Sequence, residues 1–594
     1  MIKLSDYIVS FLENKGVKDI FMLSGGFCLP LVDSVGKSGI NHVCTLHEQA
    51  AAIAAEAYAQ YNKSPGVCLV TAGPGGTNTI TGVASAWLDS IPVIVLSGQV
   101  QKKDVRGQRK VRQIGFQEID MPSIVRPITK YSKTIMEPEE AREVMEKAWH
   151  LATTGRQGPV WIEIPLDVQS AMIDPDNQKG YGSWQVKFRS KKELRRLVAK
   201  FYELLGSSER PVILAGNGIR SAGAESKFLD LASLLGIPIL TTWKAIDYMD
   251  EKDPLFVGRP GIAGQRGANF SQQTSDLFIS IGARLDHGQT AFNHENFARN
   301  AKKVIVDTDQ AEIDKMDFHI DCSICFDAAE FIDEAIAQYQ QSRDFSGWLA
   351  RCKGWQKKYP VVVPDYWEQK ELVNNYVLID VLSDLMQSSD LLIPGSSGAS
   401  SEVTMQAFRT KKGMRIFNSE GLGSMGFGIP SAIGGCIASN LRHTICVDGD
   451  GGFVMNIQEL ETVRRLQLPI KFFILNNSGY VSIRNSQNKH FDQELASSED
   501  SGVTLPDFEK IAKSYGLNYC KINSQEQIHK EVQSVLDASG PVVCEIMMLD
   551  THETLPRNST HKREDGTFVS LPMEDLLPLL PRSEFEENMS VSNG

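Results

Sequence analysis

Asp450 and Asn477 are two polar side chains whose spacing could place them around one metal ion. The chain reads here as a strand ending at Val447, a glycine-rich turn, a helix over Gln458–Leu466 and a second strand over Ile470–Leu475. Ligands of parallel sheets collect outside the carboxyl ends of the strands, so both side chains would face one crevice although 27 positions separate them. One carboxylate, one amide oxygen and a main-chain carbonyl suit Mg²⁺ and leave coordination positions for phosphate oxygens.

Glycines surround this candidate site. Gly451 and Gly452 would let main-chain amides approach a phosphate closely. The alternative is an ordinary loop, in which Asp450 and the glycines supply turn chemistry while Asn477 and Gly479 close another turn. A calcium loop of the EF-hand type is excluded, because Gly452 stands at the fifth loop position.

A second candidate is Glu48, which stands where a strand ends and an alanine-rich helix begins. A carboxyl group at such a strand end could act in proton transfer. The spacing of Thr45 and Glu48 also fits a capping box, in which the glutamate serves only to begin the helix. Local sequence favours the capping interpretation.

The elements that must position these residues follow a repeated strand–helix rhythm, which is typical of parallel sheets. The rhythm restarts twice, so we predict an α/β protein of three doubly wound parallel-sheet domains at 1–175, 192–340 and 371–550, followed by a C-terminal arm at 551–594. Linkers are expected at Asp174–Lys192 and Arg343–Lys370, which lack the rhythm. The arm contains four prolines and should pack back over the protein.

Composition narrows the class of protein further. With 42% hydrophobic and 23% charged residues, disorder is not expected, and the net charge of −12 argues against a nucleic acid partner. No apolar stretch is long enough to span a membrane, and Asp6 and Glu13 interrupt the N-terminal apolar pattern as no signal peptide would. The ten cysteines are scattered; Cys322 and Cys325 form a CxxC that we interpret as buried thiols rather than a zinc site. A reducing, cytoplasmic compartment fits best.

The spaced pattern of GDG at Gly449–Gly451 and the asparagine pair at 476–477 resembles the signature of thiamine diphosphate enzymes. The resemblance implies that Asp450, Asn477 and the carbonyl of Gly479 bind Mg²⁺. It extends to NSEGLGSMGFGIPSAIGG, where Met425 matches the apolar residue that bends the cofactor, and more weakly to PGSSGASS at Pro394–Ser401. The cofactor-binding residues it implies in this half are Ser400, Ser401, Gly423, Met425, Gly449, Gly451, Gly452, Asn477 and Tyr480.

The N-terminal region resembles the pyrimidine-binding domain of the same family through HEQAA and TAGPGGTN. The resemblance implies that Glu48 activates the aminopyrimidine of the cofactor, and that Gly25, Gly26, Pro74 and Asn78 contact it. SGGF and IGFQEID are similar to acetolactate synthase, which implies that Phe116 and Gln117 shape the substrate site. In this family the domain meets a neighbouring subunit, so a homodimer or homotetramer is implied.

The central region resembles the FAD-binding version of this fold through RQGPVWIEIP, AGNG, GARLD and VDTDQAEIDK. The residues that fall where they would contact the pyrophosphate and ribose of FAD are Arg156, Gly216, Gly218, Arg284 and Asp307. A dehydrogenase built on AGNG would bind NAD instead, but it leaves the Asp450–Asn477 pair unexplained.

The resemblance implies an enzyme that decarboxylates pyruvate, a 2-keto acid, and transfers the two-carbon unit to a second carbonyl, giving 2-acetolactate if pyruvate is also the acceptor. The alternatives are a keto-sugar acceptor, a related 2-keto acid decarboxylase, and a non-catalytic relative. The segment SGYVSIRNSQNKHFD departs most from acetolactate synthase and leaves the acceptor open. The sequence does not decide whether a regulatory subunit binds.

Overall fold

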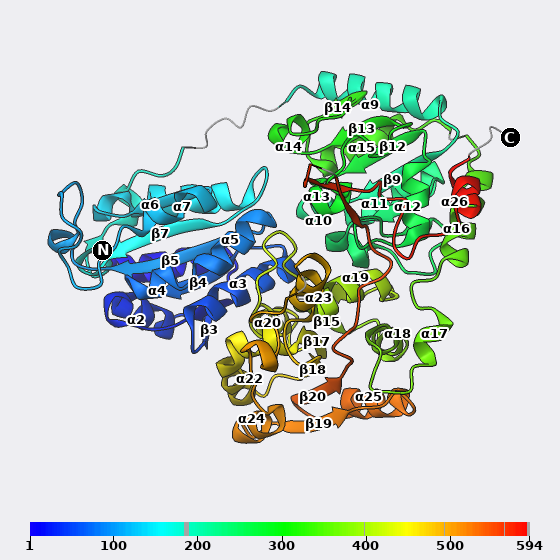
Figure 1. Ribbon diagram of the computed structural model, residues 1–594. Coiled ribbons are helices and arrows are strands. Elements are labelled where there is room, and N and C mark those ends of the chain that lie inside the picture. The colour runs from blue at the N-terminus through cyan, green and yellow to red at the C-terminus, as the bar shows by residue number, and fades with distance from the viewer. Residues whose placement is uncertain (183–188, 342, 397, 492, 564, 591–594) are drawn as a thin grey trace.

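The computed structural model describes residues 1–594 except 183–188, 342, 397, 492, 564 and 591–594. Three parallel sheets of six strands dominate the molecule, each flanked by helices (Figure 1). The first sheet has the order β3-β2-β4-β5-β7-β6, with β2 Asp19–Met22, β3 Asn41–Cys44, β4 Gly66–Val70, β5 Val93–Gln99, β6 Tyr131–Thr134 and β7 Val160–Pro165. Its central strands are runs of buried apolar residues, as expected where helices cover both faces.

The other two sheets repeat this plan. The second has the order β11-β10-β9-β12-β13-β14, with β9 Pro211–Ala215, β10 Ile239–Thr241, β11 Phe256–Gly258, β12 Leu277–Ile281, β13 Lys302–Val306 and β14 Cys322–Ile324. The third has the order β16-β15-β17-β18-β20-β19, with β15 Leu391–Pro394, β16 Arg415–Ile416, β17 Thr444–Gly449, β18 Ile470–Asn476, β19 Asn518–Ile522 and β20 Val542–Met547. The prediction of three doubly wound parallel α/β sheets is confirmed.

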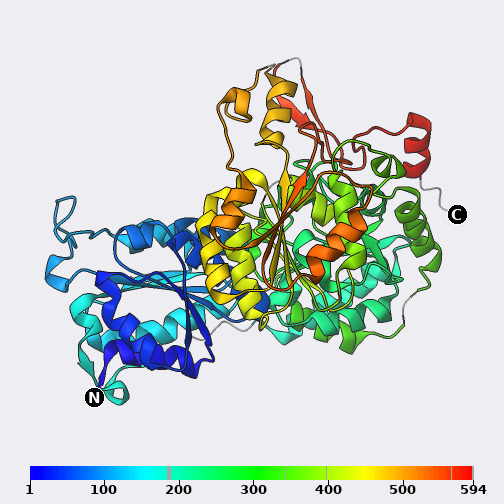
Figure 2. The same cartoon turned by 90° about the horizontal axis from the view of Figure 1, so that it is seen from below.

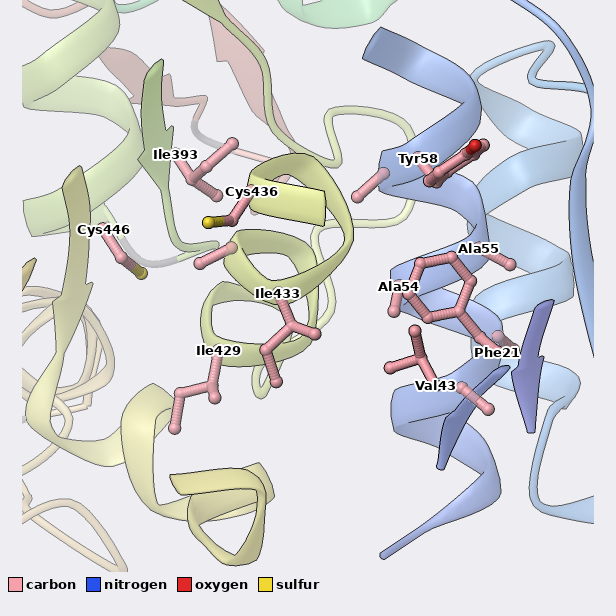
Figure 3. Close-up of a cluster of buried hydrophobic side chains, with 14 of the residues drawn as sticks. Phe21, Val43, Ala54, Ala55, Tyr58, Ile393, Ile429, Ile433, Cys436 and Cys446 are labelled. Atoms are coloured by element: carbon pink, nitrogen blue, oxygen red, sulfur yellow. The ribbon is translucent and has the colours of Figure 1, made fainter. Parts of the chain in front are cut away.

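Helix α3, Glu48–Asn62, joins the first sheet to the third through helix α20, Gly428–Ala438 (Figure 3). Its alanines are buried on all sides, because it packs on the first sheet and on α20 at once. The backbones approach closely: a Cβ at Gly434 would lie 2.1 Å from the carbonyl oxygen of Ala54. Small residues therefore set the distance between the two helices.

The segment Arg343–Lys370 holds two helices, α16 Ser346–Lys358 and α17 Pro364–Trp367, where an irregular linker was expected. The reason is a buried face of Trp348, Cys352 and Trp355, which packs against the core of the second sheet. Part of the other expected linker, 183–188, lies outside the described residues.

The C-terminal arm crosses from the third sheet to the helices beside the second (Figures 1 and 2). It forms the hairpin β21 Thr560–Lys562 and β22 Phe568–Ser570, and ends in helix α26, Arg582–Met589. Met573 enters the second core, and its carbonyl accepts a hydrogen bond from Asn269 at 2.6 Å. Among the described residues, no helix is long and apolar enough to cross a membrane.

Candidate functional site

The carboxyl ends of β17 and β18 bring Asp450 and Asn477 together. Asp450 begins a short helix, α21 Asp450–Phe453, and is almost fully buried. Its Oδ2 accepts hydrogen bonds from the amides of Asn477 and Gly479, both at 3.1 Å, and its Oδ1 accepts one from Gly451. Burial raises the pKa of the Asp450 carboxyl to about 6, although these hydrogen bonds lower it. The carboxylate thus ties the two strand ends into one loop cluster.

Two buried oxygens at this edge have no hydrogen-bond partner within the described part of the chain: Asn477 Oδ1 and Asp448 Oδ2. An orphaned buried oxygen is costly unless something absent from the protein atoms satisfies it. The donor set of a carboxylate, an amide oxygen and a nearby main-chain carbonyl fits a hard cation such as Mg²⁺. Burial raises the pKa of Asp448 to about 7, and Gly428 and Gly452 leave room for its side chain.

Met425, Gly451 and Tyr480 meet beside this cluster. A Cβ at Gly451 would lie 2.3 Å from the Tyr480 ring and 3.5 Å from the Met425 methyl group. Gly423 has φ +62° and Gly479 has φ +120°, a region that favours glycine. A side chain at Gly479 would also collide with the carbonyl oxygen of Ser497, at 2.5 Å. Met425, Gly451 and Tyr480 are thus brought side by side.

The loop after β15 lies at the same sheet edge. Ser400 and Ser401 are buried in a single π-helical turn, and the Ser401 hydroxyl accepts a hydrogen bond from the Asn418 amide at 2.9 Å. Ser396 Oγ is a further buried atom without a partner in the described structure. Ser397 lies outside the described residues.

Glu48 lies at the carboxyl edge of the first sheet as the first residue of α3. The helix N-cap is His47, whose ring accepts from the amide of Gln49, so the capping-box interpretation is wrong. The Thr45 hydroxyl donates instead to the carbonyl of His47. The Glu48 carboxylate accepts a hydrogen bond from the Asn78 amide at 3.0 Å and is 8% exposed. Its position is therefore free for a role other than capping.

The loops after β2, β4 and β5 contact one another at the carboxyl edge of the first sheet. Gly73 has φ +61°, and a Cβ there would lie 2.2 Å from the carbonyl oxygen of Gln117. A Cβ at Gly25 would lie 2.6 Å from Thr71, next to helix α4, Pro74–Thr77. Gly26 begins the following turn. Phe116 is 78% exposed.

The two polar edges belong to different domains. The Asn456 amide donates to Gln49 at 3.0 Å and to the carbonyl of Gly426 at 2.7 Å, and Glu459 accepts from the amide of Leu46 at 2.9 Å. These contacts fix the start of α3 against the third domain. The carboxylate of Glu48 itself accepts its hydrogen bond from Asn78, a residue of its own domain.

A pocket with an empty volume of about 970 Å³ lies where the three domains meet. Four of the residues predicted to bind FAD line it: Arg156, Gly218, Arg284 and Asp307. The fifth, Gly216, lies against Gly282, where a Cβ would be 2.2 Å from the carbonyl oxygen. Burial raises the pKa of Asp307 to about 6. Arg156 is already paired with Asp309 at 3.0 Å and with Glu312 at 2.5 Å.

Among the charged pocket residues that were not predicted from the sequence are Asp89, Lys244 and Glu420. Each comes from a different domain, so no local spacing connects them. Lys244 lies in the 3₁₀ turn Trp243–Tyr248, and nothing in the sequence around it indicates that its side chain is buried. The thiols of Cys322 and Cys325 are buried and directed to the carbonyls of Leu197 and Thr308.

Comparison with known proteins matches three family models in chain order. They are the N-terminal TPP binding domain of thiamine pyrophosphate enzymes at residues 2–124, the central domain at 198–335 and the C-terminal TPP binding domain at 396–546. A probable acetolactate synthase large subunit from Methanocaldococcus jannaschii is 35% identical over 592 residues, 98% of each chain. The large subunit of acetolactate synthase isozyme 1 from Escherichia coli is 32% identical, over 91% of this chain and 93% of its own. The large subunit from Cyanidium caldarium is 31% identical, over 92% and 94%.

Proposed function

The chain belongs to the acetolactate synthase large-subunit family of thiamine pyrophosphate enzymes, and from this membership we propose that it forms 2-acetolactate from two molecules of pyruvate. The observation that supports this best is the buried edge at Asp450, where the carboxylate ties two strand ends and the oxygen of Asn477 is left without a partner. Such an edge suits a metal-bound diphosphate.

Asp450, Asn477 and the carbonyl of Gly479 would hold Mg²⁺, which in turn would hold the diphosphate of the cofactor. Gly449, Gly451 and Gly452 leave the main chain free to approach phosphate oxygens, because a side chain at Gly451 or Gly452 would meet neighbours within 3 Å. Met425 and Tyr480 would form the apolar wall of the cofactor site.

Thiamine diphosphate, when bound, supplies a nucleophilic carbon that releases CO₂ from a 2-keto acid and passes the two-carbon unit to a second carbonyl. Glu48 would hold a proton at the aminopyrimidine, and Asn78 would orient its carboxyl group. Gly25, Gly26 and Pro74 would form the rest of this edge, and Gln117 and Phe116 would position the acceptor beside it.

The exposed ring of Phe116 supports a site that is completed by a second subunit. We therefore propose a homodimer or a dimer of dimers, in which the first domain of one chain faces the third domain of another. The name of the relatives, large subunit, is compatible with a smaller regulatory partner. A cytoplasmic location is proposed from the ten free cysteines.

FAD is proposed to occupy the pocket at the domain junction. The loops around Gly218 and Gly282 touch at the carboxyl ends of β9 and β12, and Asp307 follows β13, where an acidic group could meet a ribose. The purified protein should then carry a bound flavin or take up FAD, which its visible absorption reports. A protein that retains no flavin absorption after incubation with excess FAD and removal of the unbound flavin would contradict this assignment alone.

The acceptor is best taken as a second pyruvate, because the relatives named above are acetolactate synthases, and a keto-sugar acceptor is not favoured. The decisive assay supplies ¹³C-pyruvate with thiamine diphosphate and Mg²⁺ and identifies the product by NMR. Glu48→Gln should lower the rate about 10²- to 10⁴-fold, the usual contribution of general acid–base catalysis, while binding of thiamine diphosphate persists. Wild-type protein that consumes no pyruvate would contradict the proposed function.

A further inference from the structure

A buried ion pair joins the three domains at the floor of the junction pocket. Lys244 Nζ, from the second domain, donates to Asp89 Oδ2 at 3.0 Å, to Gln60 Oε1 at 2.6 Å and to the carbonyl of Asn418 at 2.6 Å. Asp89 and Gln60 belong to the first domain and Asn418 to the third. All three protons of the ammonium group are therefore used.

Asp89 also binds the main chain of the segment that leads to Met425. Its Oδ2 accepts a hydrogen bond from the amide of Glu420 at 3.0 Å, and its Oδ1 accepts one from Gly421 at 2.8 Å. Gly421 has no space for a side chain, because a Cβ would lie 2.7 Å from Leu88 and 2.8 Å from Asp89. Two residues further on is Gly423, and four residues further on is Met425.

The ion pair is buried and is linked to further polar groups of the first and third domains. The side chains of Lys244 and Asp89 are 9% and 2% exposed, so neither ion has water as an alternative partner. The hydroxyl groups of Ser85 and Ser419 lie 2.8 Å apart, which adds a second link between the first and third domains. Glu56 accepts from Ser85 at 3.2 Å and from Gln60 at 3.2 Å. A displacement of Lys244 would therefore disturb partners in both other domains.

The pocket and the cofactor wall share these residues. Asp89, Lys244 and Glu420 line the pocket. Arg284, which also lines it, donates to the carbonyl of Leu88, next to Asp89, at 2.6 Å. Burial and the neighbouring Asp286 and Asp89 raise the pKa of Glu420 to about 8, so that its carboxyl is largely protonated at neutral pH and presents a hydrogen-bond donor. A ligand in the pocket would thus contact the segment that Asp89 holds.

We propose that Lys244 and Asp89 are positioning residues that couple the junction pocket to the segment Glu420–Met425, so that FAD in the pocket strengthens the binding of thiamine diphosphate at a different site. The inference rests on the proposed cofactors. A ligand that holds Glu420 and Lys244 in place lowers the conformational entropy of residues 420–425, so the second ligand loses less entropy when it binds. The coupling is reciprocal.

The test measures the dissociation constant of thiamine diphosphate with excess Mg²⁺ by isothermal titration calorimetry, with and without saturating FAD. Wild-type protein should bind thiamine diphosphate about 5-fold or more tightly when FAD is present, and FAD should gain the same factor in the reverse titration. The double variant Lys244→Met with Asp89→Asn removes both charges together, which avoids leaving one buried ion alone. It should bind FAD more weakly, because both residues line the pocket, but at saturating FAD its affinity for thiamine diphosphate should equal that without FAD.

The matched control is Lys303→Met. Lys303 is also buried, and its ammonium group donates to the carbonyls of Ala298 and Ala301 inside the second domain, away from the junction. This variant should keep the coupling, as should Lys244→Arg, which retains the charge. Equal coupling in the double variant and in wild type would overturn the proposal, and so would wild-type protein in which FAD leaves the affinity unchanged. Failure of FAD to bind would overturn the coupling proposal together with the FAD assignment. Turnover of ¹³C-pyruvate, measured in parallel, tests the carboligase function separately.

Discussion

Gly434→Ala tests whether the distance between α3 and α20 controls catalysis. The added Cβ would lie 2.1 Å from the carbonyl oxygen of Ala54, whereas ordinary contact begins at 3.4 Å, so the helices must separate by about 1.3 Å. Overpacking of this kind costs about 1–3 kcal/mol of stability. Ala54 lies six residues after Glu48 on the same helix, about 9 Å along its axis. A displacement near 1 Å at a catalytic group can cost about 10²-fold in rate, so we expect a loss of about 10- to 100-fold in kcat.

The neighbouring glycine provides the control. A Cβ at Gly435 would meet the ends of the Leu391, Phe417 and Ile393 side chains, at 2.9, 3.0 and 3.5 Å, which can shift more easily than a main-chain carbonyl. Gly435→Ala should therefore cost less in both stability and rate. Gly354→Ala, on the exposed face of α16 with open space around it, should be neutral or stabilising. The measurements are pyruvate consumption at saturating cofactors and the thermal midpoint of each variant. A Gly434→Ala protein with the kcat of Gly435→Ala would refute the reasoning.

Two further predictions concern single polar groups. Asn477→Ala removes a buried oxygen that has no protein partner in the described structure. The variant should need an about tenfold or more higher Mg²⁺ concentration for half-maximal activity, with little change in thermal midpoint. An unchanged Mg²⁺ requirement would exclude Asn477 as a ligand. Burial raises the pKa of Glu163 to about 8, above its ordinary value near 4.5, so the folded protein holds a proton there that the unfolded chain loses. The stability contributed by this difference in pKa is present below about pH 4.5 and is lost as the pH rises towards 8. Glu163→Gln cannot ionise. Its thermal midpoint should therefore fall less between pH 5.5 and 8 than that of wild type. An identical pH dependence in both proteins would contradict this assignment.

Local sequence was enough to predict the sheets and the loops at their edges. Parallel strands are buried on both faces and therefore read as short apolar runs, and their carboxyl ends necessarily meet. This is why Asp450 and Asn477 could be placed in one crevice across 27 positions. The helix predicted between them, over Gln458–Leu466, was placed less accurately. A 3₁₀ turn at Val454–Glu459 comes before the α-helix Leu460–Leu466, because Asn456 departs from helical geometry.

Interactions between domains could not be predicted in the same way. Thr45 and Glu48 have capping-box spacing, yet the helix begins one residue after His47, because Glu48 is turned towards Asn78 from another loop. The contact of Lys244 with Asp89 depends on how whole domains pack, for which neither residue carries a local signal. In contrast, the face of Trp348, Cys352 and Trp355 has plain helical spacing, and a search for that period would have found α16.

The path of the C-terminal arm has a consequence for how the chain folds during synthesis. Met573 fills the core beside the second sheet, and Trp355 of α16 donates to Asn588 at 2.8 Å, although that sheet is complete by Ile324. A nascent chain that has emerged only as far as the third sheet therefore has a second domain whose hydrophobic interior is still open. Its closure waits for residues 573–588 to leave the ribosome, so deletion of these residues should act first on a domain made some 250 residues earlier.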